Sequence, residues 1–239
     1  MEDNKLSNRG VETLMSLRND LAAVIQTLTS NGYNISSAFD IGANKGTWTL
    51  QYEKLIPRAT FHLFEANPTH SRPARLAGRH NWFNAVLSSP QTKEVEFYGI
   101  AGTGDSYYKE DTQAYQSCTP ITLPTTTLSA IVKEHSLPLP QLIKLDTQGS
   151  ELDILKGAED VIEHVDILMT EMAVLPYNKG APTFDQYMAT LTHLGFVPVG
   201  VERVHQADNI VIQLDMVFLK TNIKTKYYGA TKFWNWSAT

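Results

Sequence analysis

"FDIGANKGTW", residues 39–48, joins the end of one apolar run to the start of another. Residues 38–41 and 60–65 are short, aromatic and β-branched, which predicts strands, and residues 47–56 between them have the apolar spacing of a helix. Glycines in such a turn let the backbone bend sharply and expose the free N–H groups of the helix start. The stretch therefore predicts a ligand-binding turn at the carboxyl end of the first strand.

The alternation of strand-like and helical runs continues along the chain. Apolar strands that alternate with helices are typical of a parallel sheet covered by helices on both faces. Too few residues separate runs 196–201 and 209–220 for a helical crossover, so the last strand is expected to be antiparallel to its neighbour. The other strand-like runs are 82–87, 95–100, 142–146 and 166–171, with helices at about 150–158 and 183–194.

Three segments outside this alternation define the predicted organisation. Residues 1–36 are expected to form an N-terminal helical segment packed on a core domain of residues 37–222, because residues 11–28 have helical apolar spacing. Residues 99–127 lack periodicity, and a long irregular insertion inside a compact domain is usually functional. Residues 223–239 form an aromatic tail that is expected to dock as a lid or against a second copy of the chain.

Composition excludes several classes of protein. The chain has 239 residues, a net charge of −5 and one cysteine. An acidic chain argues against nucleic-acid binding, and a single cysteine cannot form an internal disulfide framework. No apolar run approaches the ~18 residues of a membrane helix, and the N-terminus lacks the pattern of a signal peptide. We expect a cytoplasmic globular protein with no membrane insertion.

The turn distinguishes between two ligands, a dinucleotide and S-adenosylmethionine. Asn44 occupies the position of the central glycine in the dinucleotide fingerprint. Asp40 would repel a pyrophosphate but favours the ammonium and sulfonium groups of S-adenosylmethionine. Glu65 closes the second strand, where an acid can accept both ribose hydroxyls, although NAD enzymes also place an acid there. An oxidoreductase that binds NAD or a nucleotide sugar remains the alternative.

The predicted cofactor contacts come from four strand ends, and the adenine is expected beside the third. They are Asp40, Gly42, Ala43, Asn44, Gly46, Thr49, Glu65, Ala66, Asn84, Ala85, Val86 and Asp146.

A second strand-to-helix turn follows residues 142–146 and carries the predicted catalytic acids. Asp146 ends this strand and Glu171 ends the next, so both are expected on the rim where a transferable methyl group emerges. One would act as general base and the other would orient the acceptor, with Asp146 slightly favoured, unless both are structural acids. Lys144, inside an apolar strand, is expected to snorkel or to pair with an acid.

Two further expectations concern the helix that follows and a metal. Ser150 and Asp153 have the spacing of a capping box, and Glu151 is expected to be an exposed acid in the first helical turn. The histidines lack metal-ligand spacing, so no metal site is predicted, although a divalent ion between Asp146 and Glu171 remains open.

Several ordered blocks resemble the FkbM-type methyltransferases. They are "FDIGANKGTWTL", "LFEANP", "NAVLSS", "LIKLDTQGSELDILKGA" and "TEM", between about residues 37 and 172. The resemblance implies a class I, Rossmann-like fold with a seven-stranded core, and S-adenosylmethionine-dependent O-methylation of sugars, glycolipids or polyketide-like metabolites. Ala66 replaces a proline of the family and Gln148 replaces a glutamate. The second change puts a catalytic role for position 148 in doubt and leaves a catalytically silent cofactor-binding partner as another alternative.

Overall fold

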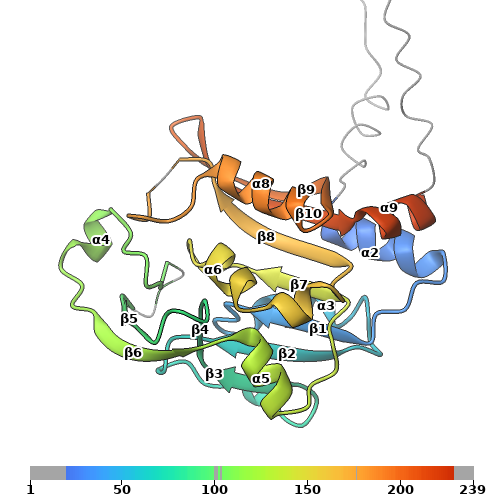
Figure 1. Cartoon of the computed structure of the whole chain (residues 1–239), viewed down its shortest axis with the longest axis horizontal. Coiled ribbons are helices and arrows are strands. Elements are labelled where there is room, and N and C mark those ends of the chain that lie inside the picture. The colour runs from blue at the N-terminus through green and yellow to red at the C-terminus, as the bar shows by residue number, and fades with distance from the viewer. Residues whose placement is uncertain (1–19, 100–101, 103, 176, 229–239) are drawn as a thin grey trace, which may run out of the picture.

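One seven-stranded sheet forms the centre of the molecule (Figure 1). In the computed structural model of the chain, residues 20–99, 102, 104–175 and 177–228 are described. The strand order is β3-β2-β1-β7-β8-β10-β9, in which β10 is antiparallel to both β8 and β9 and the other neighbours are parallel. This order is that of the class I methyltransferase fold, so the predicted fold is confirmed. The strands are β1 (Ser37–Ile41), β2 (Thr60–Glu65), β3 (Asn81–Asn84), β7 (Leu142–Leu145), β8 (Ile167–Ala173), β9 (Phe196–Ala207) and β10 (Ile210–Lys220).

Helices cover both faces of the sheet, as the alternation predicted. One face packs against α2 (Leu21–Ser30), α3 (Thr47–Tyr52) and α9 (Thr221–Tyr228). The other face packs against α5 (Leu128–Glu134), α6 (Glu151–Lys156), α7 (Glu159–Ile162) and α8 (Phe184–His193). Helices α2 and α9 lie side by side (Figure 1).

The predicted N-terminal and C-terminal segments fall partly outside the described residues. Helix α2 overlaps the predicted helix over residues 11–28, and it begins at Asp20, whose carboxylate accepts a hydrogen bond from the Ala23 N–H. Residues 1–19 and the tail beyond residue 228 lie outside the description. In the part of the chain that the structure describes, no helix is long and apolar enough to cross a membrane.

Register places a row of charged side chains on the α2 and α3 face, near the carboxyl ends of the strands. Strand residues alternate between faces with a period of two. Ala38, Leu142 and Met169 belong to the core on this face, so Asp40, Lys144 and Glu171 follow on the same side.

Cross-strand pairing brings these charges together. Asp40 pairs with Lys144 across β1 and β7, and Glu171 pairs with Asp215 across β8 and β10. The main sheet therefore carries titratable groups across four neighbouring strands.

The insertion is more ordered than expected. A second sheet, in the order β4-β6-β5, contains β4 (Val86–Leu87), β5 (Glu94–Phe97) and β6 (Ile121–Thr126). The prediction of one strand over 82–87 was wrong, because the Ala85 N–H bonds to Glu65 O and the chain then leaves β3 to pair with β6. Residues 121–126 were expected to be irregular because the segment around them contains prolines and has little periodicity, yet they pair there with β4 and β5.

Short helical elements and bridges complete the insertion and its surroundings. These are α4 (Gln113–Gln116), within the insertion, and the 3-10 helix η1 (Ala74–Leu76). Isolated bridges join Tyr98 to Ser106 and Glu110 to Asn178. The second bridge ties the insertion to the segment after β8, so the insertion is held over the end of the main sheet.

Candidate active site

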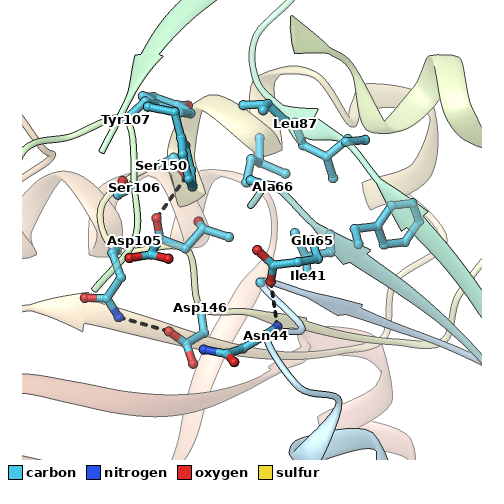
Figure 2. A pocket seen from close by; sticks show the side chains of 18 of the residues that line it. Ile41, Asn44, Glu65, Ala66, Leu87, Asp105, Ser106, Tyr107, Asp146 and Ser150 are labelled. Atoms are coloured by element: carbon cyan, nitrogen blue, oxygen red, sulfur yellow. Dashed lines mark hydrogen bonds between the residues drawn. The ribbon is translucent and has the colours of Figure 1, made fainter. Parts of the chain in front are cut away.

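A pocket lies beyond the carboxyl ends of β1, β2, β3 and β7 (Figure 2). The side chains of Asn44, Glu65 and Asp146 lie on one side, and Asp105 and Tyr107 of the insertion approach from another. Of the predicted cofactor contacts, the wall contains Gly42, Asn44, Glu65, Ala66, Ala85, Val86 and Asp146. The predicted contacts Asp40, Ala43, Gly46, Thr49 and Asn84 are not part of it.

The conformation of the first turn explains its sequence. Gly42 has φ +75°, and a Cβ there would lie 1.8 Å from the Asp146 carbonyl oxygen, so no other residue fits without a backbone shift. Asn44 has φ +48°, a left-handed conformation that asparagine tolerates. Gly46 has φ +65°, and a Cβ there would lie 2.5 Å from Leu76. The three residues shape the turn, but only the first two face the pocket.

Glu65 is held by the backbone of two loops. Its carboxylate accepts hydrogen bonds from the N–H groups of Asn44, at 2.6 Å, and Asn67, at 2.7 Å. Burial raises the pKa of Glu65, and these two hydrogen bonds offset only part of that effect. The bonds fix the carboxylate in the pocket wall, where its remaining lone pairs can accept ribose hydroxyls.

Asp40 lies beneath the turn rather than in the pocket. Its side chain is fully buried, accepts a hydrogen bond from Thr49 Oγ1 at 2.8 Å and lies 3.3 Å from Lys144 Nζ. Lys144 also donates to the Gly42 carbonyl at 2.7 Å and lies 3.4 Å from Asp146. The predicted pairing of Lys144 with an acid is confirmed. In this arrangement Asp40 and Thr49 support the first turn from beneath, through Lys144.

The second turn is built around Gln148. This residue has φ +56°, and its amide nitrogen donates to Asp146 at 3.1 Å and to Glu171. The hydroxyl of Tyr177 donates to the amide oxygen of Gln148 at 3.2 Å. A neutral amide with two N–H donors thus separates two carboxylates, which a glutamate at this position could not do.

The expectations for the following helix were wrong. Glu151 is only 1% exposed, because its carboxylate accepts bonds from the N–H groups of Thr147 and Gly149 and from the Tyr187 hydroxyl. Ser150 makes no side-chain cap and instead donates to the Thr147 carbonyl. A buried acid therefore closes the turn that the serine was expected to cap.

Asp146 and Glu171 have opposite electrostatic environments. Burial favours the neutral form of Asp146, but the charge of Lys144 and the hydrogen bonds from Glu171, Gln148 and Lys144 together outweigh it and hold the pKa of Asp146 below its usual range. Burial, together with the negative charges of Asp146, Glu151 and Asp215, raises the pKa of Glu171 well above its usual value. Among the described residues, Glu171 takes part in no ion pair. The two acids are therefore separated in basicity, as in acid–base pairs of known enzymes.

Glu171 also belongs to a group of side chains that resembles a metal-ligand set. Ligand atoms of Glu171, His205 and Asp215 lie within 4.8 Å of one another. His205 lies 3.4 Å from Asp215, and Glu171 accepts a hydrogen bond from Gln148, so each of the three side chains has a partner within the protein.

Comparison with known proteins identifies the family. The model of the FkbM methyltransferase domain matches residues 40–198. The chain belongs to the FkbM methyltransferase family. The protein is therefore an S-adenosylmethionine-dependent methyltransferase, and the matched segment contains every residue of the pocket wall. A search of curated protein sequences gave no match.

Solved structures of other methyltransferases share the architecture at low identity. Magnesium protoporphyrin IX methyltransferase from Synechocystis PCC 6803, with bound SAM, has a TM-score of 0.46 and 9% identity, covering 83% of this chain and 77% of that one. N-methyltransferase NodS from Bradyrhizobium japonicum WM9, with S-adenosylhomocysteine, has a TM-score of 0.43 and 12% identity, covering 86% and 91%. An O-methyltransferase family protein from Burkholderia thailandensis has a TM-score of 0.44 and 10% identity, covering 84% and 55%. Similarities as low as these do not identify the acceptor of the FkbM methyltransferase.

Several wall residues of the methyltransferase were not anticipated. Asp105 and Ser106 come from the insertion, of which only the tyrosines Tyr107, Tyr108 and Tyr115 were expected to stack on a sugar ring or to pack the loop down. Tyr108 of the same loop donates to Asp153 at 2.7 Å, which holds the loop down. His70 had no sequence signal. The remaining wall residues outside the predictions are Ile41, Phe64, Leu87, Phe97, Gly102, Thr147, Gln148, Ser150 and Ile154.

Proposed function

We propose that this methyltransferase transfers the methyl group of S-adenosylmethionine to a hydroxyl oxygen of a small polar acceptor, a saccharide or glycolipid in the first place. The observation that carries the proposal is the placement of Glu171. It is a buried carboxylate with a raised pKa and no ion pair among the described residues, and it shares Gln148 with the wall residue Asp146. An alcohol needs a base of this kind, because it gives up its proton reluctantly.

In the proposed reaction, the acceptor oxygen attacks the methyl carbon in line with the bond to sulfur. The O–CH₃ bond forms as the S–CH₃ bond breaks, S-adenosylhomocysteine leaves, and the hydroxyl proton passes to Glu171. Asp146 and Gln148 orient the acceptor, since a proper approach of about 3–3.5 Å is itself a large part of catalysis. General-base catalysis of this kind contributes about 10²–10⁴-fold to the rate.

We propose Glu171 rather than Asp146 as the general base, which reverses the preference that the sequence suggested. Asp146 was slightly favoured as base because it ends the strand nearer the methyl group. Its ion pair with Lys144 and its lowered pKa make it the weaker base, which supports Glu171 for proton transfer and Asp146 for orientation. Glu65 would hold the ribose, and Ala85 and Val86 would line the adenine site.

The polar groups around the two acids favour a hydroxyl-rich acceptor. Tyr177 and Gln148 add a hydroxyl and an amide beside Asp146 and Glu171, and sugars are bound by such mixed donors and acceptors. The single cysteine agrees with a cytoplasmic enzyme. Assembly of two copies through the C-terminal tail stays a proposal.

The test is a transfer assay with S-adenosylmethionine that carries a deuterated methyl group. Purified protein is incubated with panels of neutral sugars, amino sugars and glycolipids, and mass spectrometry locates the label on each product. We expect the label on a hydroxyl oxygen, with little product from the Glu171→Gln variant. A label found on nitrogen or carbon, or an undiminished rate in that variant, contradicts the proposal.

A further inference from the structure

His70 has a ring nitrogen that lacks a partner inside the pocket. The residue lies in the loop after β2 and forms part of the pocket wall, with a side chain that is 10% exposed. Its Nδ1 is buried and makes no hydrogen bond. Buried polar atoms nearly always have a partner in folded proteins, so the free nitrogen indicates that a ligand atom belongs there.

The nearest group of suitable chemistry is the carboxylate of Glu65. Nδ1 of His70 lies 3.7 Å from Oε1 of Glu65, which is too long for a direct hydrogen bond. An oxygen atom about 2.8 Å from each of them fits between the two. The position therefore suits a hydroxyl that donates to the carboxylate and accepts from the ring.

The backbone of the loop is built to hold His70 in this position. The His70 N–H donates to the Asn67 carbonyl at 3.1 Å, and the side-chain amide of Asn84 donates to the His70 carbonyl at 3.0 Å. Asn67 is fixed in turn by bonds from the backbone and hydroxyl of Thr69. Asn84, a predicted cofactor contact, thus supports the pocket wall from behind.

We infer that His70 and Glu65 together bind one ribose hydroxyl of S-adenosylmethionine. A carboxylate is acceptor-only, so a hydroxyl that donates to Glu65 keeps its own lone pairs unused. His70, in the tautomer with hydrogen on Nδ1, donates a hydrogen bond to one of these lone pairs. The inference rests on S-adenosylmethionine being the cofactor of this methyltransferase. It adds His70, which lies outside the first turn, to the residues that recognise the cofactor.

The experiment measures the affinity of S-adenosylhomocysteine by calorimetry for the wild type and four variants. His70→Ala should weaken binding by about tenfold, in the range of one hydrogen bond. His70→Asn should recover most of the affinity because its amide nitrogen overlies Nδ1, whereas His70→Gln, which overlies Nε2, should not. His164→Ala, a variant at an exposed histidine, is the matched control and should bind as the wild type does.

Analogues of S-adenosylhomocysteine that lack the 2′- or the 3′-hydroxyl separate a direct contact from a structural role. In the wild type, loss of the contacted hydroxyl should weaken binding severalfold, and in His70→Ala the same loss should have little further effect. A His70→Ala variant that keeps the full penalty, or that binds S-adenosylhomocysteine as tightly as the wild type, overturns the inference. A wild-type protein that does not bind S-adenosylhomocysteine overturns the cofactor assignment itself. This outcome differs from a failure of the inference about His70, so the two can be told apart.

Discussion

Lys144 and Asp40 form a buried ion pair across β1 and β7, with Nζ and Oδ1 separated by 3.3 Å. Lys144 also contacts Asp146 and the Gly42 carbonyl. One ammonium group thus connects both ligand-binding turns and compensates an acid at the end of each of two neighbouring strands. The pair gives the pocket its geometry and also lowers the basicity of Asp146.

Lys144→Met should destabilise the fold strongly. The change keeps the length of the side chain but leaves the Asp40 carboxylate buried without a counter-charge, which costs about 3–5 kcal/mol. Urea unfolding measures the effect. Adding Asp40→Asn to this variant should recover part of the loss, since the uncompensated charge is then gone. Lys156→Met is the control: Lys156 is 64% exposed in its pair with Asp153, and this pair should contribute about 0–1 kcal/mol. Equal losses in the two lysine variants would contradict this account.

The methylation rate should rise with pH through the raised pKa of Glu171. A base must be deprotonated to act, and burial with neighbouring acids keeps the proton on Glu171 well above pH 4.5. Glu171→Gln should lose this dependence together with about 10²–10⁴-fold of the turnover, while binding of S-adenosylhomocysteine changes little. The measurement is a pH–rate profile at saturating cofactor, and a profile that is unchanged in Glu171→Gln would assign the base elsewhere.

The same shift affects stability with a defined sign. A folded-state pKa above the unfolded value stabilises the protein fully below pH 4.5, and this contribution disappears as the pH rises through the folded pKa. Unfolding free energies of wild type and Glu171→Gln, measured across this range, should therefore diverge, with the wild type losing stability relative to the variant as the pH rises.

Gln148→Glu should raise the apparent pKa of the catalytic base. The substitution restores the glutamate that the family resemblance implies and places a third carboxylate against Asp146 and Glu171. Like charges disfavour ionisation, so the rising limb of the pH–rate profile should move upward by about one unit or more. A limb that stays in place would mean that the side chain at position 148 does not approach Glu171 in the working enzyme.

Comparison of Gly42→Ala with Gly195→Ala separates two causes of lost stability, the strain of a positive φ and the steric overlap of an added Cβ. Both glycines have positive φ, but a Cβ at Gly195 meets nothing within 4 Å, whereas one at Gly42 would overlap the Asp146 carbonyl. We expect a loss of about 1–2 kcal/mol at Gly195 and on the order of 4 kcal/mol at Gly42, measured by urea unfolding. Gly42→Ala should also abolish cofactor binding, because the first turn must shift.

S-adenosylmethionine and S-adenosylhomocysteine should raise the melting temperature, and NAD should not. A ligand at 100 times its dissociation constant adds about 2.7 kcal/mol of stability. Glu65→Gln should reduce this effect, since the amide replaces one acceptor by a donor, while Glu134→Gln at an exposed position should retain it. A response to NAD alone would argue for the oxidoreductase alternative.

The sequence by itself determined those features that depend on residues close together in the chain. Strand–helix alternation predicted the layers, the short link between β9 and β10 predicted the hairpin, and glycines and asparagine marked the turn at residues 42–46. The end of β2 placed Glu65 in the pocket. These features follow from backbone geometry and periodicity, which a single sequence records directly.

Tertiary structure decided which of the predicted residues line the pocket. Asp40 has the sequence position of a cofactor contact, but β1–β7 register turns it onto Lys144. Burial, together with the negative charges of Asp146, Glu151 and Asp215, raises the pKa of Glu171, and this makes Glu171 the stronger base of the two acids. His70 is held in the pocket wall partly by the side chain of Asn84, which comes close to it only in the folded chain. Charge interactions and burial depend on distances between segments far apart in sequence, and local patterns carry no measure of those distances.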